Sequence, residues 1–319
     1  MRDGVSASRV AVSGGPWASV AQFLARRLRA GIDWPARMAQ GGVLDEHGRP
    51  VAADAPCKHG AVLWYWRSLP AEPRVPFEID LLHQCEHLVV VDKPHFLPVT
   101  PGGRYLQETA LVRLKRLLGM DTLVPMHRLD LETAGVLVFT VQPSARPAYH
   151  AMMREQRAHK VYEAVAPWRS DLALPCTASH RLQEPAHEGF MQMQVLPGAA
   201  NAHTRIELLA RLGDGPGGTP LALYRLTPLT GRKHQLRAQL NALGLPIVGD
   251  RIYPRLWPAP AADAVPDHSQ PLQLLAREIS FTDPVTGQAR HFVSRRSLAR
   301  AGSAASAAAA AAPESPTSP

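Results

Sequence analysis

Two periods in the apolar positions run along this chain, and together they predict a mixture of strands and amphipathic helices. Because the predicted strands follow one another without regular strand–helix alternation, we expect an α+β fold with a mixed, largely antiparallel central sheet and flanking helices. Apolar runs or alternation, which are typical of strands, cover residues 87–91, 136–141, 160–166, 204–209, 221–228 and 272–277. Apolar positions three and four apart, which are typical of helices, recur in residues 19–30, 109–118, 145–157 and 233–243.

The local content of serine, alanine, glycine and proline changes along the chain and divides it into five segments. Residues 1–15 are rich in serine and glycine, and we expect them to be loose. The pattern of residues 16–66 predicts a small module of two helices and short strands. The three prolines within 67–78 indicate a semi-extended linker. Residues 79–300 form the large domain, in which 170–200 are expected to be loop-like. The remainder, 301–319, is mostly Ala, Ser and Pro and is expected to be disordered.

Charge and cysteine content narrow the kind of protein. The 319 residues carry a formal charge of +8, which favours a polyanionic partner, although an arginine-rich composition alone also makes a chain basic. The three cysteines are far apart and odd in number, so no disulfide framework is predicted and a reducing cytoplasm is the expected compartment. No apolar run is long enough to span a membrane. We expect a monomer that does not contact a membrane.

The stretch 126–140 holds the first candidate chemistry. Asp130 lies two residues after Arg128 and shortly before Gly135 and an apolar strand, where a rigid scaffold could present a reactive carboxylate. Asp and Thr side chains before a glycine also occur in ordinary turns, where they bond nearby backbone amides. The residues alone leave both interpretations open.

A second cluster lies at residues 227–237, where a turn leads into a predicted helix. Cations at a helix N-terminus oppose the helix dipole, so Arg232, Lys233 and His234 indicate a nearby anion. Arg237 follows one turn later on the same face, and we predict that it pairs with Asp130 and keeps that carboxylate ionised and oriented. The alternative is a solvated basic face without a fixed partner.

Other cofactor or metal chemistry finds little support in the sequence. His83, Cys85 and His87 would share one face of a strand, but structural zinc normally draws four ligands from paired short motifs. Phosphate-loop, dinucleotide and nucleophile-elbow motifs do not occur. We therefore expect no cofactor and no metal.

Residues 127–135, with the sequence HRLDLETAG, resemble the signature of the RluA-type RNA pseudouridine synthases. Three further blocks agree in the same order, at residues 92–94, 160–162 and 230–250. The resemblance covers residues 77–290 and implies the pseudouridine synthase fold. The module at 16–66 loosely resembles the αL-type RNA-binding module.

The resemblance also implies an activity: a uridine in structured RNA is isomerised to pseudouridine without cofactor or metal. Asp130 would be the nucleophile or anionic stabiliser at C1′, and Arg237 would hold it. Tyr162 would stack on the uracil and is a candidate for removing the C5 proton. Leu236 would pack against the base, and Arg128 would fill the space left by the flipped uridine.

The remaining residues of the implied site would bind RNA or support the loop. Lys160, Arg232 and Lys233 are expected RNA contacts, and His127 is expected to support the loop more than to react. A cationic helix at 109–118, carrying Arg113, Lys115 and Arg116, would grip phosphate together with the N-terminal module. Ribosomal RNA is favoured over transfer RNA as the substrate.

Three positions depart from the family pattern, and two other functions stay open. Phe96, Ala134 and Gln239 stand where the family often has Gly, Ser and His, which bears on loop conformation and substrate preference. One alternative is a nucleoside or glycoside hydrolase that uses Asp130 with Glu132 as a carboxylate pair. The other is a catalytically idle RNA-binding protein with a role in ribosome assembly.

Overall fold

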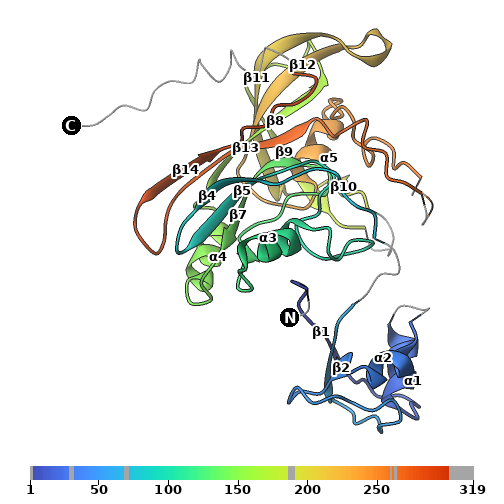
Figure 1. The fold of residues 1–319 in the computed structure, drawn as a ribbon. Helices are drawn as coiled ribbons and strands as arrows, with labels where there is room; N and C mark the ends of the chain where they lie inside the picture. The colour runs from blue at the N-terminus through green and yellow to red at the C-terminus, as the bar shows by residue number, and fades with distance from the viewer. Residues whose placement is uncertain are drawn as a thin grey trace. The chain divides into compact units, whose positions relative to one another are not determined.

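A computed structural model describes residues 3–28, 32–67, 72–185, 191–258, 261 and 264–301 of the chain (Figure 1). The chain divides into two compact units, which are described separately. One holds the described residues of Met1–Glu72 and Thr100–Asp121, and the other those of Pro73–Val99 and Thr122–Pro319. Residues 302–319 of the expected tail and part of the expected linker lie outside the described residues, whereas Ala301 is described and buried. The domain boundaries stay a prediction.

The first unit combines three helices with a three-stranded sheet in the order β1-β3-β2. Its elements are β1 (Ser8–Ala11), α1 (Val20–Arg27), α2 (Trp34–Ala39), β2 (Val43–Leu44), β3 (Val62–Tyr65) and α3 (Ala110–Leu118). The Ser19 hydroxyl caps α1 by accepting a hydrogen bond from the backbone N–H of Gln22. The expectation of a loose N-terminus is wrong for Ser8–Ala11, because this segment pairs antiparallel with β3.

Helix α3 differs from its predicted cationic form. Thr109 caps its start and Gly119, in the left-handed conformation, ends it, as expected for such residues. Lys115, however, is buried, and Arg113 forms an ion pair with Glu108. Arg116 is the exposed cation of the three, so the helix offers phosphate less positive charge than the sequence indicated.

The second unit is built on an eleven-stranded sheet, whose main path runs β10-β9-β11-β12-β8-β13-β7-β5-β4 (Figure 1). β14 pairs with β13, and β6 pairs with β7. The strands are β4 (Asp80–Gln84), β5 (Leu88–Lys93), β6 (Val124–Pro125), β7 (Ala134–Thr140), β8 (His159–Pro167), β9 (Cys176–Gln183), β10 (Gln194–Leu196), β11 (Ala202–Asp214), β12 (Pro220–Pro228), β13 (Leu274–Thr282) and β14 (Ala289–Val293). The prediction of a mixed, largely antiparallel sheet is confirmed, since β7 with β13 is the one parallel pair among the described strands.

Two helices pack on this sheet and complete its cores. Tyr149 and Met152 of α4 (Arg146–Arg154) join a buried cluster with residues of β5, β7 and β13. Leu236 and Leu240 of α5 (Gln235–Ala242) join another with residues of β8, β9, β11, β12 and β13. These helices are short, and no helix in the described part of the chain is long and apolar enough to cross a membrane.

The loop-like interpretation of residues 170–200 is wrong. This region contains β9, which pairs with β11, and β10, which pairs with β9. Only Ala178 and Leu182 of β9 are buried, and polar residues occupy most of its other positions. Its sequence therefore lacks the apolar run that revealed β5 and β7, whose residues are all buried.

Gly135 fixes how closely the parallel strands approach each other. Its φ is +114°, and a Cβ atom at this position would overlap the backbone carbonyl of Ala276 in β13. Only glycine combines this φ with such close contact. The strand that follows Asp130 is thereby held directly against β13, which also pairs with β8, the strand that carries Tyr162.

Candidate active site

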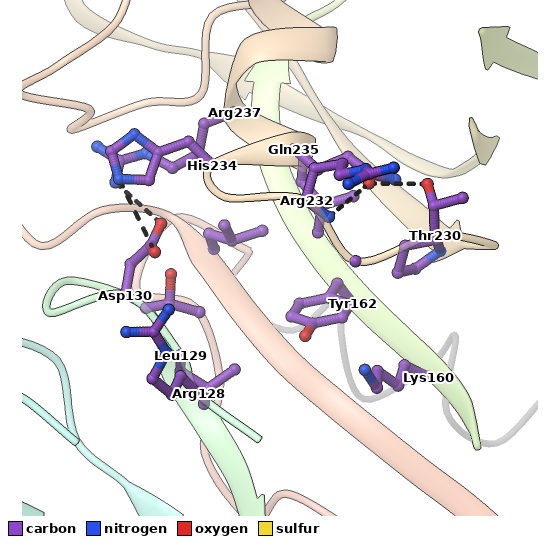
Figure 2. A pocket seen from close by; sticks show the side chains of 15 residues that line it. Arg128, Leu129, Asp130, Lys160, Tyr162, Thr230, Arg232, His234, Gln235 and Arg237 are labelled. Atoms are coloured by element: carbon purple, nitrogen blue, oxygen red, sulfur yellow. Dashed lines mark hydrogen bonds and ion pairs between the residues drawn. The ribbon is translucent and has the colours of Figure 1, made fainter. Parts of the chain in front are cut away.

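A pocket in the second unit lies among the loop before β7, strand β8, the loop after β12 and the start of α5 (Figure 2). Seven of the nine residues predicted to form the site line it: Arg128, Asp130, Lys160, Tyr162, Arg232, Leu236 and Arg237. The two others, His127 and Lys233, lie outside its lining. Segments more than 100 residues apart in the sequence thus meet here.

Arg237 is the centre of the charge arrangement. Its Nη1 donates to Asp130 Oδ2 at 3.1 Å, which is the pair that the sequence predicts. Nε and Nη2 donate to the two oxygens of Asp250 at 2.8 and 2.6 Å, and Nη2 lies 3.6 Å from Glu132 Oε2. The Arg237 side chain is 2% exposed. Burial alone would lower its pKa, but the carboxylates, Asp250 foremost, outweigh burial and raise it.

Asp250 anchors the Arg237 guanidinium, and no local sequence pattern indicates this role. Its side chain is fully buried and also accepts hydrogen bonds from the backbone N–H groups of Ile252 and Tyr253 at 2.8 and 2.9 Å. Four donors therefore satisfy one carboxylate. The bidentate geometry fixes the plane of the Arg237 guanidinium, and with it the direction of the bond to Asp130.

Glu132 is a second carboxylate beside the site, but it does not line the pocket. Its oxygens face Arg237 at 3.6 Å and Arg251 at 3.7 Å. Burial raises the pKa of Glu132, while the two guanidinium groups oppose this shift. The Glu132 carboxylate therefore faces two cations and does not face the space where a substrate would bind.

Strand β8 supplies the flat ring and a cation of the pocket, and Figure 2 shows Tyr162 and Lys160 on it. Burial, and then the charge of Asp130, raise the pKa of the Tyr162 phenol, so the hydroxyl stays protonated at neutral pH. Burial also lowers the pKa of Lys160. A neutral phenol beside a carboxylate suits stacking on a planar base better than it suits proton abstraction.

The loop between β12 and α5 is shaped by Gln235, which was not among the predicted site residues. Its Oε1 accepts from the Thr230 hydroxyl at 2.8 Å and from the Arg232 backbone N–H at 3.0 Å. Its Nε2 donates to the His203 carbonyl at 3.1 Å. These bonds tie the Arg232 loop to β11. An amide at the start of a helix, beside turn residues, was the available signal.

Two predicted contacts lie elsewhere. His127 Nε2 accepts from the backbone N–H of Val138 at 3.3 Å, and burial lowers its pKa to about 3, so the ring is neutral and supports the loop. Lys233 is exposed and lies 3.4 Å from Glu184. Neither side chain lines the pocket.

Lys93, at the end of β5, supports the Asp130 loop from outside the pocket. Its ammonium donates to the backbone carbonyls of Pro94, Leu97 and Leu131 at 2.9, 2.8 and 3.2 Å. Burial lowers its pKa to about 7, although Asp130 acts in the opposite direction. The bond to Leu131 fixes the backbone immediately after Asp130.

Two departures from the family pattern have structural counterparts. Phe96 adopts φ +64°, a conformation that suits glycine, and its ring packs against His268 at 4.9 Å. Gln239 donates to the carbonyls of Ala178 and Ala202 and accepts from the Thr204 hydroxyl, so it ties α5 to β9 and β11.

The arrangement presents one oriented carboxylate next to an aromatic ring, with cations around the opening. Such a carboxylate can attack an electrophilic sugar carbon or stabilise positive charge that develops there. Among the described residues, no group of three or more His, Cys, Asp or Glu side chains could hold a metal ion.

Known proteins are similar to this chain in sequence and fold. A family model described as RNA pseudouridylate synthase matches residues 87–242. An RNA pseudouridine synthase of Synechocystis is 32% identical over 226 residues, covering 69% of this chain and 73% of that protein. The dual-specificity RNA pseudouridine synthase RluA of Haemophilus influenzae is 32% identical over 229 residues, covering 69% of this chain and 94% of the relative.

Solved structures agree at the level of the fold. Human RNA pseudouridylate synthase domain containing 1 superposes with a TM-score of 0.56 at 20% identity, covering 77% of this chain and all of that one. Human RNA pseudouridylate synthase domain containing 4 gives a TM-score of 0.50 at 26% identity, covering 72% and 92%. The predicted pseudouridine synthase fold is confirmed.

The fold, the sequence blocks and the relatives define an RNA-modifying isomerase, the class of enzyme that converts uridine into pseudouridine. Within that class, the chain belongs to the RluA-type RNA pseudouridine synthases.

Proposed function

We propose that Asp130 is the residue through which this enzyme isomerises specific uridines of structured RNA. The observation that carries the proposal is the hydrogen bond from the buried Arg237 to Asp130 Oδ2, at the wall of a pocket open to solvent. Asp250 fixes the Arg237 guanidinium from the far side, so the carboxylate is held before substrate arrives. Preorganisation of this kind lowers the barrier to reaction at the sugar.

The reaction needs no other reactant, because it rearranges bonds within one nucleotide. The N1–C1′ bond breaks, the uracil turns, C5 bonds to C1′, and the proton on C5 leaves while N1 regains one. Asp130 acts at C1′ as nucleophile or as anionic stabiliser. Tyr162 stacks on the uracil, and Leu236, 8% exposed, packs against its edge.

Cations around the pocket supply the grip on RNA. Arg128, Arg232 and Lys160 line the pocket and Lys233 is exposed, so all four would contact phosphate, and Arg128 would also fill the space of the flipped uridine. Affinity for RNA should therefore fall with salt. His127 would act only through the loop that it supports.

The wider assignment extends the sequence analysis. We infer that residues 79–300 are the catalytic domain, that the module at 16–66 helps to bind RNA, and that the protein acts as a monomer in the cytoplasm. Ribosomal RNA is favoured over transfer RNA as its substrate. Mapping pseudouridines across all RNA in cells that lack the protein would identify the modified sites.

The deciding experiment measures tritium release from RNA that carries 5-³H-uridine. Asp130→Asn keeps the shape of the side chain but removes its charge, and we expect it to lower the rate by about 10³-fold or more. Asp171→Asn, an exposed aspartate outside the pocket, is the matched control and should leave the rate within twofold.

Two outcomes would overturn the proposal. Full tritium release by Asp130→Asn would remove Asp130 from the chemistry. No release by the unaltered protein from any cellular RNA, with tight binding retained, would favour the idle RNA-binding protein.

Hydrolysis has no support from the site, because Glu132, the second carboxylate that it would need, is held by two arginines outside the pocket.

A further inference from the structure

His234 has a backbone conformation that aims its side chain. It precedes α5 with φ +50° and ψ +19°, in the left-handed region, and its side chain makes no capping hydrogen bond. Few residues other than glycine adopt this conformation, although asparagine, aspartate and histidine do so more often than the rest. The contacts of the ring, and not this backbone conformation alone, therefore hold the side chain in place.

The ring lies at the wall of the pocket next to Asp130, as Figure 2 shows. Its Nε2 is 3.9 Å from Asp130 Oδ1, and its side chain is 9% exposed. The ring also packs edge-on against Tyr253, with centroids 6.0 Å apart. These contacts leave the imidazole little freedom to turn away from the carboxylate.

The surroundings also select the protonation form of His234. Burial lowers its pKa, as do Arg237 and Lys233, while Asp130 and Asp250 act in the opposite direction, so the ring is neutral at neutral pH. Nδ1 is buried and has no hydrogen-bond partner among the described residues. A proton on Nδ1 would leave a buried donor unsatisfied and turn the Nε2 lone pair toward a carboxylate. The favoured tautomer therefore carries its proton on Nε2, facing Asp130.

The two oxygens of Asp130 thus have different neighbours. Oδ2 accepts a charge-assisted hydrogen bond from Arg237 at 3.1 Å. Oδ1 faces the His234 donor at 3.9 Å, which is longer than a hydrogen bond. Oδ1 is consequently the oxygen that can move onto a substrate atom without giving up a bond to a cation.

We propose that His234 is a positioning residue for Asp130: its Nε2–H keeps Oδ1 directed into the pocket while Arg237 fixes Oδ2, so that Oδ1 is the oxygen that meets C1′. This assignment rests on the proposed role of Asp130. A purely structural role, in which His234 only starts α5, would depend on its backbone and not on the position of Nε2.

Two variants separate these roles. In His234→Gln the amide nitrogen reaches about as far as Nε2, whereas in His234→Asn it reaches only as far as Nδ1, although Asn suits the left-handed backbone better. We expect the single-turnover rate of His234→Asn to fall roughly ten- to a hundredfold, the scale for a reacting group that is displaced by about 1 Å. His234→Gln should stay within about threefold of the unaltered enzyme, and RNA affinity should change less than twofold in both.

Several results would overturn the proposal. One is a single-turnover rate of His234→Asn that equals or exceeds that of His234→Gln. Another is an equal loss of rate in both variants. A third is a loss of RNA affinity without a loss of rate. If His234→Gln does not fold, His234→Gly decides, because it fits the backbone and leaves room for free imidazole. Recovery of its rate with added imidazole supports the positioning role, and no recovery overturns it.

The Asp130→Asn variant, measured on the same RNA, keeps the two proposals apart. Activity in that variant would overturn the role of Asp130 itself. An inactive Asp130→Asn beside fully active His234 variants would overturn only the inference about His234.

Discussion

Two buried cations hold the Asp130 loop from different regions, and their surroundings are opposite in kind. Arg237 in α5 lies among three carboxylates, those of Asp130, Glu132 and Asp250. Lys93 at the end of β5 is bonded to three backbone carbonyls. Arg237 forms ion pairs with the side chains of Asp130 and Glu132, while Lys93 donates a hydrogen bond to the backbone carbonyl of Leu131, which lies between them in the sequence. Successive residues of one loop are thus fixed by different cations.

The difference shows what keeps a buried charge charged. Carbonyl dipoles satisfy the hydrogen-bond donors of Lys93, but they do not repay its loss of water, and its pKa falls to about 7. The carboxylates around Arg237 outweigh burial, and its pKa rises. The guanidinium is the group that stays charged at any pH at which the protein folds, so it suits the task of orienting a carboxylate.

The largest effect should come from removing the cation among the carboxylates. Arg237→Leu leaves the buried Asp250 without a cation and Glu132 with Arg251 alone, and we expect the free energy of unfolding to fall by about 3–5 kcal/mol. Turnover should fall at least about 10²-fold, because Asp130 loses its fixed donor. Urea unfolding and tritium release measure the two losses.

Arg205→Leu is the control for that variant, because Arg205 is an exposed strand arginine paired with Glu207. It should change the free energy of unfolding by less than about 1 kcal/mol. Equal losses in the two variants would show that the carboxylates do not need Arg237.

The second effect depends on pH and comes from Lys93. Its pKa is about 7 in the folded state and 10.5 as a free side chain, so between these values the folded protein binds fewer protons than the unfolded chain. Stability from this group therefore rises with pH across that window. The free energy of unfolding, relative to that of Lys93→Met, should increase by about 2 kcal/mol from pH 7 to pH 9. Urea unfolding at several pH values would show it, and a flat difference would mean that Lys93 keeps its ordinary pKa.

The smallest effect should come from Glu132→Gln. The amide keeps the volume but loses the attraction to Arg237 and Arg251, and we expect the free energy of unfolding to fall by about 1 kcal/mol. Pseudouridine formation should fall less than about tenfold, because Glu132 does not line the pocket. Severe loss of turnover, or release of free uracil by the unaltered enzyme, would instead favour a hydrolytic carboxylate pair.

The pattern of apolar positions predicted those strands and helices that bury most of one face. The buried strands β5 and β7 and the capped helices α1 and α3 follow from apolar periodicity and from Ser19 and Thr109. Strand β9 was not predicted because it buries only two of its residues, and its formation depends on pairing with neighbouring strands.

The site divides in the same way. The cations at residues 232–234 predicted a nearby anion, and Arg237, one turn later, was the predicted partner of Asp130. The roles of Asp250, Lys93 and His234 depend on which segments meet in space and on one left-handed residue, and neither can be read from spacing along the chain. The φ of Phe96 shows the same limit, since the sequence reveals the departure from glycine but not its packing against His268.

The parallel contact between β7 and β13 also dictates when the enzyme can become active during synthesis. Gly135 pairs with Ala276, so the strand behind Asp130 waits for a partner made 276 − 135 = 141 residues later. At translation rates of ~5–20 residues per second, the wait is on the order of ten seconds. Arg237 has left the ribosome earlier than β13, yet the ladder that joins β7 to the Tyr162 strand is still incomplete. The ladder that joins the segment of Asp130 to the strand of Tyr162 therefore forms only late in the synthesis of the chain.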